Sequence, residues 1–277
     1  MNATTLATRW VDSRLNAGIA QLTAYNYRIA LKPFCTMFSD VPLERIDVPR
    51  LAAYRRMLQQ TVSPGTAKVR WDMALAAIRW GQELGEVPPF RIPRDVRRMR
   101  GAPPHRRVWS RDEVRRMLDR CDPLMRTCVL LGVNLGYGNR DCARLEPRHV
   151  CGSVVDAPRH KTGAERRGWL WPETLDALRR CPLPLTNDAG TSLVKDFNDY
   201  LRPRFYRLLE LSSVPRNGRG FYSLRRAYRT AVDSHPDRPA IDLTMGHATP
   251  GMGHRYVAWI DDERLRSVSM HARERLL

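Results

Sequence analysis

The sequence predicts a mainly α-helical protein with two domains: a bundle of four helices, then an α+β domain of helices with a small antiparallel sheet. Three observations predict this class. Apolar residues recur at helical spacing over most of the chain, and a stretch rich in proline and arginine interrupts that pattern at residues 87–105. Two short strand-like segments flank one turn near residue 163. A length of 277 residues also suits two domains better than one.

The first domain is expected at residues 1–86. Between residues 4 and 84 the apolar stripes are helical and the connections are short. Pro49 and Pro64 each stand at the start of a helix, where proline is well tolerated. Pro33 falls inside the second apolar stretch, so it is expected to kink or interrupt that helix.

Residues 87–105 are predicted to form a linker. They contain five prolines, which prevent a continuous helix and stiffen the connection, with five arginines between them. The arginines suit a segment that lies along a phosphate backbone.

The second domain is expected at residues 106–277. Ser110 and Glu113 have the spacing of a capping box, so a helix is predicted to begin there. Further helices are expected after it, among them a single helix over Thr191–Leu211. Val154–His160 and Arg167–Trp171 are expected to pair as strands of a hairpin.

The charge balance predicts a polyanionic partner. The formal net charge is +18 and the pI is near 10.5, which favours nucleic acid bound in a salt-dependent manner. The candidate DNA contacts are Arg50, Lys68, Arg70, Arg97, Arg98, Arg166 and Arg167. A solvated basic surface explains each of them individually.

Other classes of site find no support in the composition. The six cysteines form no C-x-x-C pairs, so neither a zinc site nor a disulfide framework is indicated. No run of about eighteen apolar residues and no signal peptide is found, so we expect no membrane partner and a cytoplasmic, nucleoid-associated protein.

Three side chains near the C-terminal end can act on a phosphodiester. Tyr256 can attack phosphorus and form a phosphotyrosine ester, although a lone tyrosine is more often a buried ring. Arg225 lies on an otherwise apolar helical face and needs an anion, which is either a phosphate or an internal partner such as Asp233 or Asp242. His247 can bind a phosphate oxygen or move a proton, although an isolated histidine there is more often a helix C-cap.

Lys161 is predicted at the tip of the hairpin, in R-H-K-T-G, in a chain with only four lysines. A group that donates a proton to a leaving 5′-oxygen cannot be arginine, whose pKa is too high, whereas lysine can do so. The alternative is an exposed turn lysine.

The pattern L-R-x(20)-G-H-x(8)-Y, with the upstream K-T-G hairpin, resembles the tyrosine recombinase (phage integrase) family over nearly the whole chain. The segments G-Y-G-N-R-D, P-R-H-K-T-G and L-W-P-E-T resemble a planctomycete-type subgroup of integrase-like proteins. The resemblance implies a core-binding (SAM-like) bundle followed by the family's catalytic domain.

The resemblance also implies a role for each candidate. Tyr256 matches the nucleophile, Arg225 the second arginine, Lys161 the hairpin lysine, and His247 the histidine or tryptophan nine residues before the tyrosine. Tyr222 stands where the family has a histidine.

The first arginine of the family falls on Gly138, with Arg140 two residues later. Three explanations stay open: Arg140 reaches the phosphate, another arginine such as Arg166, Arg167 or Arg226 replaces it, or the protein binds DNA and cuts it poorly or not at all.

The implied function is site-specific recombination of double-stranded DNA, either integration or excision, through a 3′-phosphotyrosine intermediate. The family acts as a homotetramer on two DNA sites, without cofactor, metal or small-molecule substrate. The alternatives are a non-catalytic DNA-binding protein on the same scaffold and a relaxing enzyme like type IB topoisomerases. An amphipathic helix over Asp261–Leu277 is expected to pack on a neighbouring subunit or on its own domain.

Overall fold

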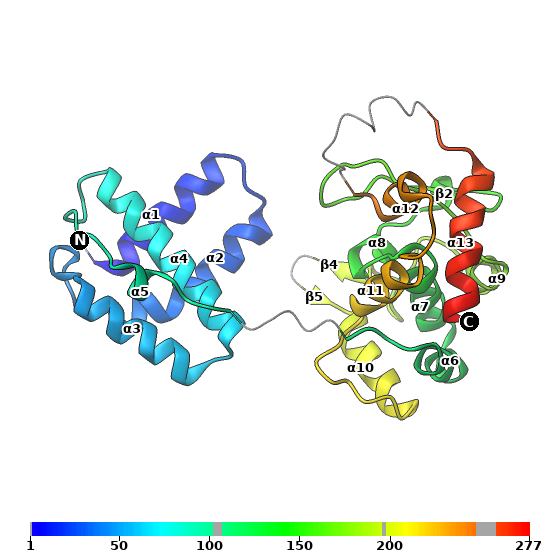
Figure 1. Ribbon diagram of the computed structural model, residues 1–277, viewed down its shortest axis with the longest axis horizontal. Helices are drawn as coiled ribbons and strands as arrows, with labels where there is room; N and C mark the ends of the chain where they lie inside the picture. The colour runs from blue at the N-terminus through cyan, green and yellow to red at the C-terminus, as the bar shows by residue number, and fades with distance from the viewer. Residues whose placement is uncertain (1, 102–106, 196–197, 248–258) are drawn as a thin grey trace. The chain divides into compact units, whose positions relative to one another are not determined.

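The computed structural model describes residues 2–101, 107–195, 198–247 and 259–277. The chain divides into two units, Met1–Pro104 and His105–Leu277, and each has an apolar core of its own (Figure 1). Both are mainly helical, and the second also holds a small antiparallel sheet, so the predicted fold class is confirmed. None of the helices in these ranges is long and apolar enough to cross a membrane.

Four long helices build the first unit. They are α1 (Ala3–Asn16), α2 (Gln21–Met37), α3 (Val48–Thr61) and α4 (Pro64–Glu83). The aromatic rings of Phe34, Tyr54 and Trp71 are fully buried between them. Helix α2 continues through Pro33, so that proline does not end the helix as one of the predictions had it. The carbonyl that loses its donor belongs to Ile29, which is exposed, and water can replace the missing N–H there.

The proline- and arginine-rich segment packs on this bundle over much of its length. Val87 and Met99 are buried in the core of the first unit. The indole N–H of Trp71 donates to the carbonyl of Arg97 at 2.9 Å, at the end of the short helix α5 (Arg94–Arg97). The arginines of this segment are therefore carried on a backbone that packs against the bundle.

In the second unit, α7 (Pro123–Leu135) is buried on all sides. Figure 1 shows it between α9 (Pro172–Arg180) and α13 (Asp262–Leu276) on one flank and α8 (Asn139–Ala143) and α11 (Ser223–Ala231) on the other. The remaining helices are α6 (Arg111–Arg120), α10 (Leu201–Leu211) and α12 (Arg238–Met245). The capping box predicted for α6 is present.

The sheet has three short antiparallel strands in the order β1 (Val150–Cys151), β2 (Val154–Asp156) and β3 (Arg167–Trp169). The predicted hairpin is therefore confirmed, although its strands are shorter than expected and β1 was not predicted. Gly168 lets β3 lie directly on α7, because a Cβ there would come within 2.6 Å of the Leu135 side chain.

The prediction of a single helix over Thr191–Leu211 is wrong. A two-stranded antiparallel sheet, β4 (Val194–Lys195) with β5 (Asn198–Asp199), occupies its first part, and α10 begins at Leu201. An Asp199 side-chain oxygen accepts the backbone N–H of Arg202 at 3.2 Å. An aspartate side chain accepts backbone N–H groups in this way at the start of a helix. Asp199 therefore favours a helix start near Leu201, inside the segment for which the apolar spacing predicted one continuous helix.

Helix α13 packs on its own unit, against α6, α7, α11, α12 and β3. Asn134 of α7 lies at the centre of this contact and is fully buried. Its Nδ2 donates to the Trp169 carbonyl at 2.9 Å and to Ser269 Oγ at 3.0 Å, while its Oδ1 accepts from the Trp171 N–H at 2.8 Å and from Thr174 Oγ1 at 2.9 Å. One amide thus joins α7, β3, α9 and α13.

Candidate active site

Arg225 lies on the buried face of α11, and its side chain is 3% exposed. Its Nη1 donates to the carbonyl of Gly136 at 2.9 Å, and its Nη2 donates to the carbonyl of Met245 at 2.6 Å. The internal acids considered from the sequence are engaged elsewhere, since Asp233 pairs with Arg229 at 2.6 Å and Asp242 with His247 at 3.3 Å. Within the described ranges, Arg225 therefore makes no ion pair.

The two acceptors of Arg225 are the C-terminal ends of helices. Gly136 ends α7 and Gly246 ends α12, both in the left-handed conformation that favours glycine, with φ of 65° and 59°. Carbonyls at a helix C-terminus carry partial negative charge, which holds a guanidinium without neutralising it. Burial lowers the pKa of Arg225, and the nearby charge of Arg159 lowers it further. An anion at this point would relieve both effects.

His247 directly follows Gly246 and is partly exposed. Its Nδ1 lies 3.3 Å from Asp242 Oδ1, and its backbone N–H donates to the Asp242 carbonyl at 3.0 Å. Burial lowers the pKa of His247, and the charges of Arg225 and Arg159 add to this, while Asp242 opposes it. A neutral imidazole that donates from Nδ1 to Asp242 leaves Nε2 as a proton acceptor.

Tyr222 precedes α11 and is 51% exposed. Its ring lies over Gly138, where an added Cβ would be 3.4 Å from the tyrosine Cδ2. The Gly138 N–H donates to Asp141 Oδ2 at 2.8 Å, so the position that matches the first arginine of the resemblance supplies backbone only. Arg140, two residues on, lies half-buried on α8.

Two other arginines that were predicted to contact DNA have acidic partners. The buried Arg166 pairs with Asp141 at 3.1 Å. Arg167 pairs with Asp262 at 2.9 Å, and its guanidinium lies 4.6 Å from the centre of the Trp259 ring. Both side chains thus link the hairpin to other elements of the second unit.

Lys161 is exposed at the tip of the hairpin, as predicted. The tip contacts the residue that ends α8, since Arg144 Nη1 lies 2.8 Å from His160 Nδ1. Burial lowers the pKa of His160, followed by the charges of Arg144 and Arg140. The positive charges of Arg140 and Arg144 therefore act on the tip of the hairpin.

Tyr256 lies outside the described residues. The structure does bring Arg225, His247 and Tyr222 into one region. Arg159, at the base of the hairpin tip, lies near enough for its charge to act on Arg225 and His247. Sequence reasoning did not single out Arg159. Its signal is weak, because it is one arginine among many and differs only in preceding Lys161 by two positions.

In the first unit, three of the predicted DNA contacts line one groove of 390 Å³: Lys68, Arg97 and Arg98. Arg79 and Arg94 add two positive charges, and Asp72 is the one acid in the lining. Lys68 forms an ion pair with Asp72. Arg50, by contrast, pairs with Asp47 at 2.7 Å at the start of α3.

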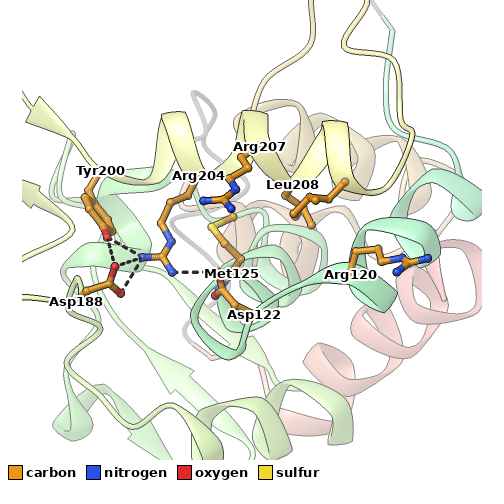
Figure 2. A pocket seen from close by; sticks show the side chains of 9 residues that line it. Arg120, Asp122, Met125, Asp188, Tyr200, Arg204, Arg207 and Leu208 are labelled. Atoms are coloured by element: carbon orange, nitrogen blue, oxygen red, sulfur yellow. Dashed lines mark hydrogen bonds and ion pairs between the residues drawn. The ribbon is translucent and has the colours of Figure 1, made fainter.

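A cavity of 420 Å³ between α10 and the start of α7 offers a contrast (Figure 2). Its Arg204 lies 2.8 Å from Asp188 and 3.1 Å from Asp122, and it also bonds the Tyr200 hydroxyl. Figure 2 shows these partners turned toward one guanidinium. Although burial alone would lower the pKa of Arg204, its hydrogen bonds to Asp188 and Asp122 raise it. This arginine has the carboxylate partners that Arg225 lacks within the described part of the chain, so the cavity is a poor phosphate site.

Comparison with protein-family models gives no match, and comparison with curated proteins gives none. Solved structures do match. A lambda integrase dimer bound to a COC′ core site has 17% identity and a TM-score of 0.77, over 94% of this chain and 98% of that one. A lambda integrase tetramer bound to a Holliday junction has 16% identity and a TM-score of 0.73, over 95% of this chain and 80% of that one.

The integrase of transposon Tn1549, in complex with circular intermediate DNA, has 14% identity and a TM-score of 0.67, over 96% of this chain and 98% of that one. At these identities the likeness is one of fold. The chain has the tyrosine-recombinase fold that the sequence predicts.

Proposed function

We propose that the protein is a site-specific DNA recombinase of the tyrosine type, acting through Tyr256. The observation that carries the proposal is the setting of Arg225. A buried guanidinium is held between two helix ends with no carboxylate partner in the described part of the chain, and His247 lies beside it. Such a site is ready to receive a phosphodiester.

The shared fold supports the same proposal. The lambda and Tn1549 integrases are similar to this chain over both units and were solved on DNA. A lambda integrase tetramer was solved on a Holliday junction. We therefore propose double-stranded DNA as the substrate and a homotetramer on two DNA sites as the active assembly.

In the proposed reaction, the hydroxyl oxygen of Tyr256 forms a bond to the scissile phosphorus, and the bond from phosphorus to the 5′-oxygen breaks. Lys161 protonates the leaving 5′-oxygen. Arg225, His247, Tyr222 and Arg140 hold the phosphate. Attack by the 5′-hydroxyl of a second strand on the phosphotyrosine reverses the step and completes the exchange, so the phosphate bond is conserved.

The first unit grips the duplex through its basic groove. Lys68, Arg97 and Arg98 line that groove together, on an ordered backbone, and Arg50 and Arg70 extend the basic surface of the same unit. Contacts of this kind position the protein on phosphates without selecting a sequence. Arg166 and Arg167 of the second unit are proposed to support binding by holding the hairpin in place.

One observation favours a second candidate, a DNA-binding protein that cuts poorly or not at all. Gly138 offers no side chain where the resemblance places an arginine, and the ring of Tyr222 covers it. Loss of one electrostatic contact to a transition state typically costs about 10²–10³ in rate.

A covalent-adduct assay separates the two candidates. Duplexes bound by the full-length protein are selected from a random pool, a nick is placed in the selected site, and a protein–DNA adduct is sought on a denaturing gel. We expect an adduct with the wild type and with Tyr206→Phe, a matched control on α10, and none with Tyr256→Phe. Binding without an adduct refutes the recombinase and supports the DNA-binding protein. An adduct with Tyr256→Phe refutes the nucleophile.

Strand exchange between two labelled duplexes then tests the assembly. A recombinase joins the two labels, whereas an enzyme like the type IB topoisomerases relaxes supercoiled DNA and leaves the labels apart.

A further inference from the structure

Arg159 has a fixed backbone at the base of the hairpin tip. Its N–H donates to the carbonyl of Ala164 at 2.8 Å. Its own carbonyl accepts from the N–H groups of Thr162 at 3.1 Å and Gly163 at 2.8 Å. The turn that carries Lys161 is therefore closed on the peptide groups of Arg159, two positions earlier.

The stem of Arg159 crosses Gly246. A Cβ placed on Gly246 would lie 3.1 Å from Arg159 Cβ and 3.3 Å from Arg159 Cδ, closer than nearly all real contacts of that kind. Gly246 stands between Met245, whose carbonyl accepts from Arg225, and His247. Because Gly246 has no side chain, Arg159 can lie against the same helix end that holds Arg225.

Unlike Arg166 and Arg167 of the same hairpin, Arg159 has no counter-ion among the residues that the structure describes. Arg166 pairs with Asp141, and Arg167 pairs with Asp156 and Asp262. Arg159 is half-buried, and its guanidinium makes no hydrogen bond or ion pair with any residue in the described ranges. It nevertheless acts on Arg225 and His247, since its positive charge disfavours the protonated form of both. Two like charges close together in a partly desolvated setting are unfavourable without an anion between or beside them.

We propose that Arg159 is a phosphate-contacting catalytic residue, which supplies from the hairpin the second guanidinium of the site built around Arg225. The ligand is the scissile phosphodiester, and the inference rests on the proposed function. Arg159 and Arg225 donate to the non-bridging oxygens while the Tyr256 oxygen bonds to phosphorus and the 5′-oxygen leaves with a proton from Lys161. This arrangement replaces the side chain that is absent at Gly138.

The first test needs no DNA. The full-length protein is titrated with inorganic phosphate at constant ionic strength, and the imidazole signal of His247 is followed by NMR, assigned through His247→Gln. We expect a saturable shift in the wild type. Arg159→Ala should weaken phosphate binding by about tenfold or more, as removal of a charged hydrogen bond typically does. Arg180→Ala removes an exposed charge of the same unit and should change it less than about twofold.

The same imidazole signal, followed against pH, gives a second readout. Removal of the neighbouring positive charge in Arg159→Ala should move the titration midpoint of His247 upward, and Arg180→Ala should leave it in place. Equal phosphate binding by the wild type and Arg159→Ala, or no saturable shift in the wild type, overturns the proposal.

The second test uses the nicked substrate with either a phosphodiester or an uncharged methylphosphonate at the scissile position. On the phosphodiester, Arg159→Ala should form the adduct about 10²-fold more slowly than the wild type. On the methylphosphonate, which lacks one anionic non-bridging oxygen and is neutral before attack, the difference should shrink to about tenfold or less. A residue that only supports the hairpin would give the same loss on both substrates, and that result also overturns the proposal. If the wild type forms no adduct on either substrate, the proposed function fails, while phosphate titration still decides the role of Arg159.

Discussion

Replacing Arg225 with methionine is expected to leave the stability of the second unit nearly unchanged, whereas the same change at Arg219 should weaken it severely. The two arginines are similarly buried, at 3% and 7% exposure. Arg219 lies in a bidentate pair with Glu113, with both N–O distances at 2.6 Å, and its guanidinium stacks 3.8 Å from the centre of the Trp109 ring. Arg225 has two neutral carbonyls instead.

The magnitudes follow from these partners. Each hydrogen bond of Arg225 contributes about 1.5–3 kcal/mol, because the donor is charged. Burial of an uncompensated guanidinium costs several kcal/mol in the opposite direction, in agreement with the lowered pKa of Arg225. The two contributions cancel to within about 2 kcal/mol, and methionine keeps part of the packing of the stem. Removal of Arg219 leaves the partly buried Glu113 carboxylate, 14% exposed, without its partner, and breaking a largely buried pair in this way typically costs about 3 kcal/mol or more.

Urea unfolding followed by circular dichroism measures both variants. The two units are fitted as separate transitions, because a chain of two units need not unfold in one step. A loss for Arg225→Met as large as that for Arg219→Met would refute the reasoning, since it would mean that Arg225 has a stabilising anionic partner. Phosphate binding should in turn be lost in Arg225→Met and kept in Arg219→Met at urea concentrations where both are folded.

Three further outcomes are expected. Asn134→Leu should lower the free energy of unfolding by about 3–5 kcal/mol in the same urea assay, because it leaves the buried Trp171 N–H and Thr174 Oγ1 without an acceptor and takes one donor from the Trp169 carbonyl and from Ser269 Oγ. Burial alone would raise the pKa of Glu113, but its bonds to Arg219 and Ser110 lower it, so its stabilisation is present above about pH 4.5 and is lost as the pH falls through the folded-state pKa. Glu113→Gln should therefore flatten the acid limb of a stability–pH curve. Gly246→Ala and Gly218→Ala both place a side chain at positive φ and should each cost about 1–2 kcal/mol, but only Gly246→Ala should weaken phosphate binding, since a Cβ at Gly218 meets nothing within 4 Å.

Local chemistry made much of the fold predictable. The capping box at Ser110 and the prolines that open α3, α4, α7 and α9 act over a few residues, so the helix starts follow directly from the sequence. The hairpin followed from its turn and from the β-branched and aromatic residues beside it. The resemblance carried by the C-terminal motif likewise predicted that Arg225 and His247 belong to one site.

The failures come from interactions between distant segments. The strands β4 and β5 depend on a neighbour that pairs with them, which apolar periodicity does not record. The pairing of Arg166 with Asp141 could not be predicted either, because nothing near Arg166 in the sequence shows that Asp141 lies beside it in the fold. Sequence analysis did not single out Arg159 for a related reason: in a chain with many arginines, only the residues around one in the fold set it apart from the others. That it has no counter-ion among the described residues is a property of the folded neighbourhood.

The closure of the hairpin turn on the peptide groups of Arg159 has a kinetic consequence. The proposed proton donor, Lys161, and the proposed phosphate ligand, Arg159, belong to one hydrogen-bonded turn and must move together. Displacement of the hairpin would withdraw acid catalysis and charge stabilisation in a single motion. A DNA-bound protomer with its hairpin displaced should therefore lose the proton donor and the phosphate ligand at the same time.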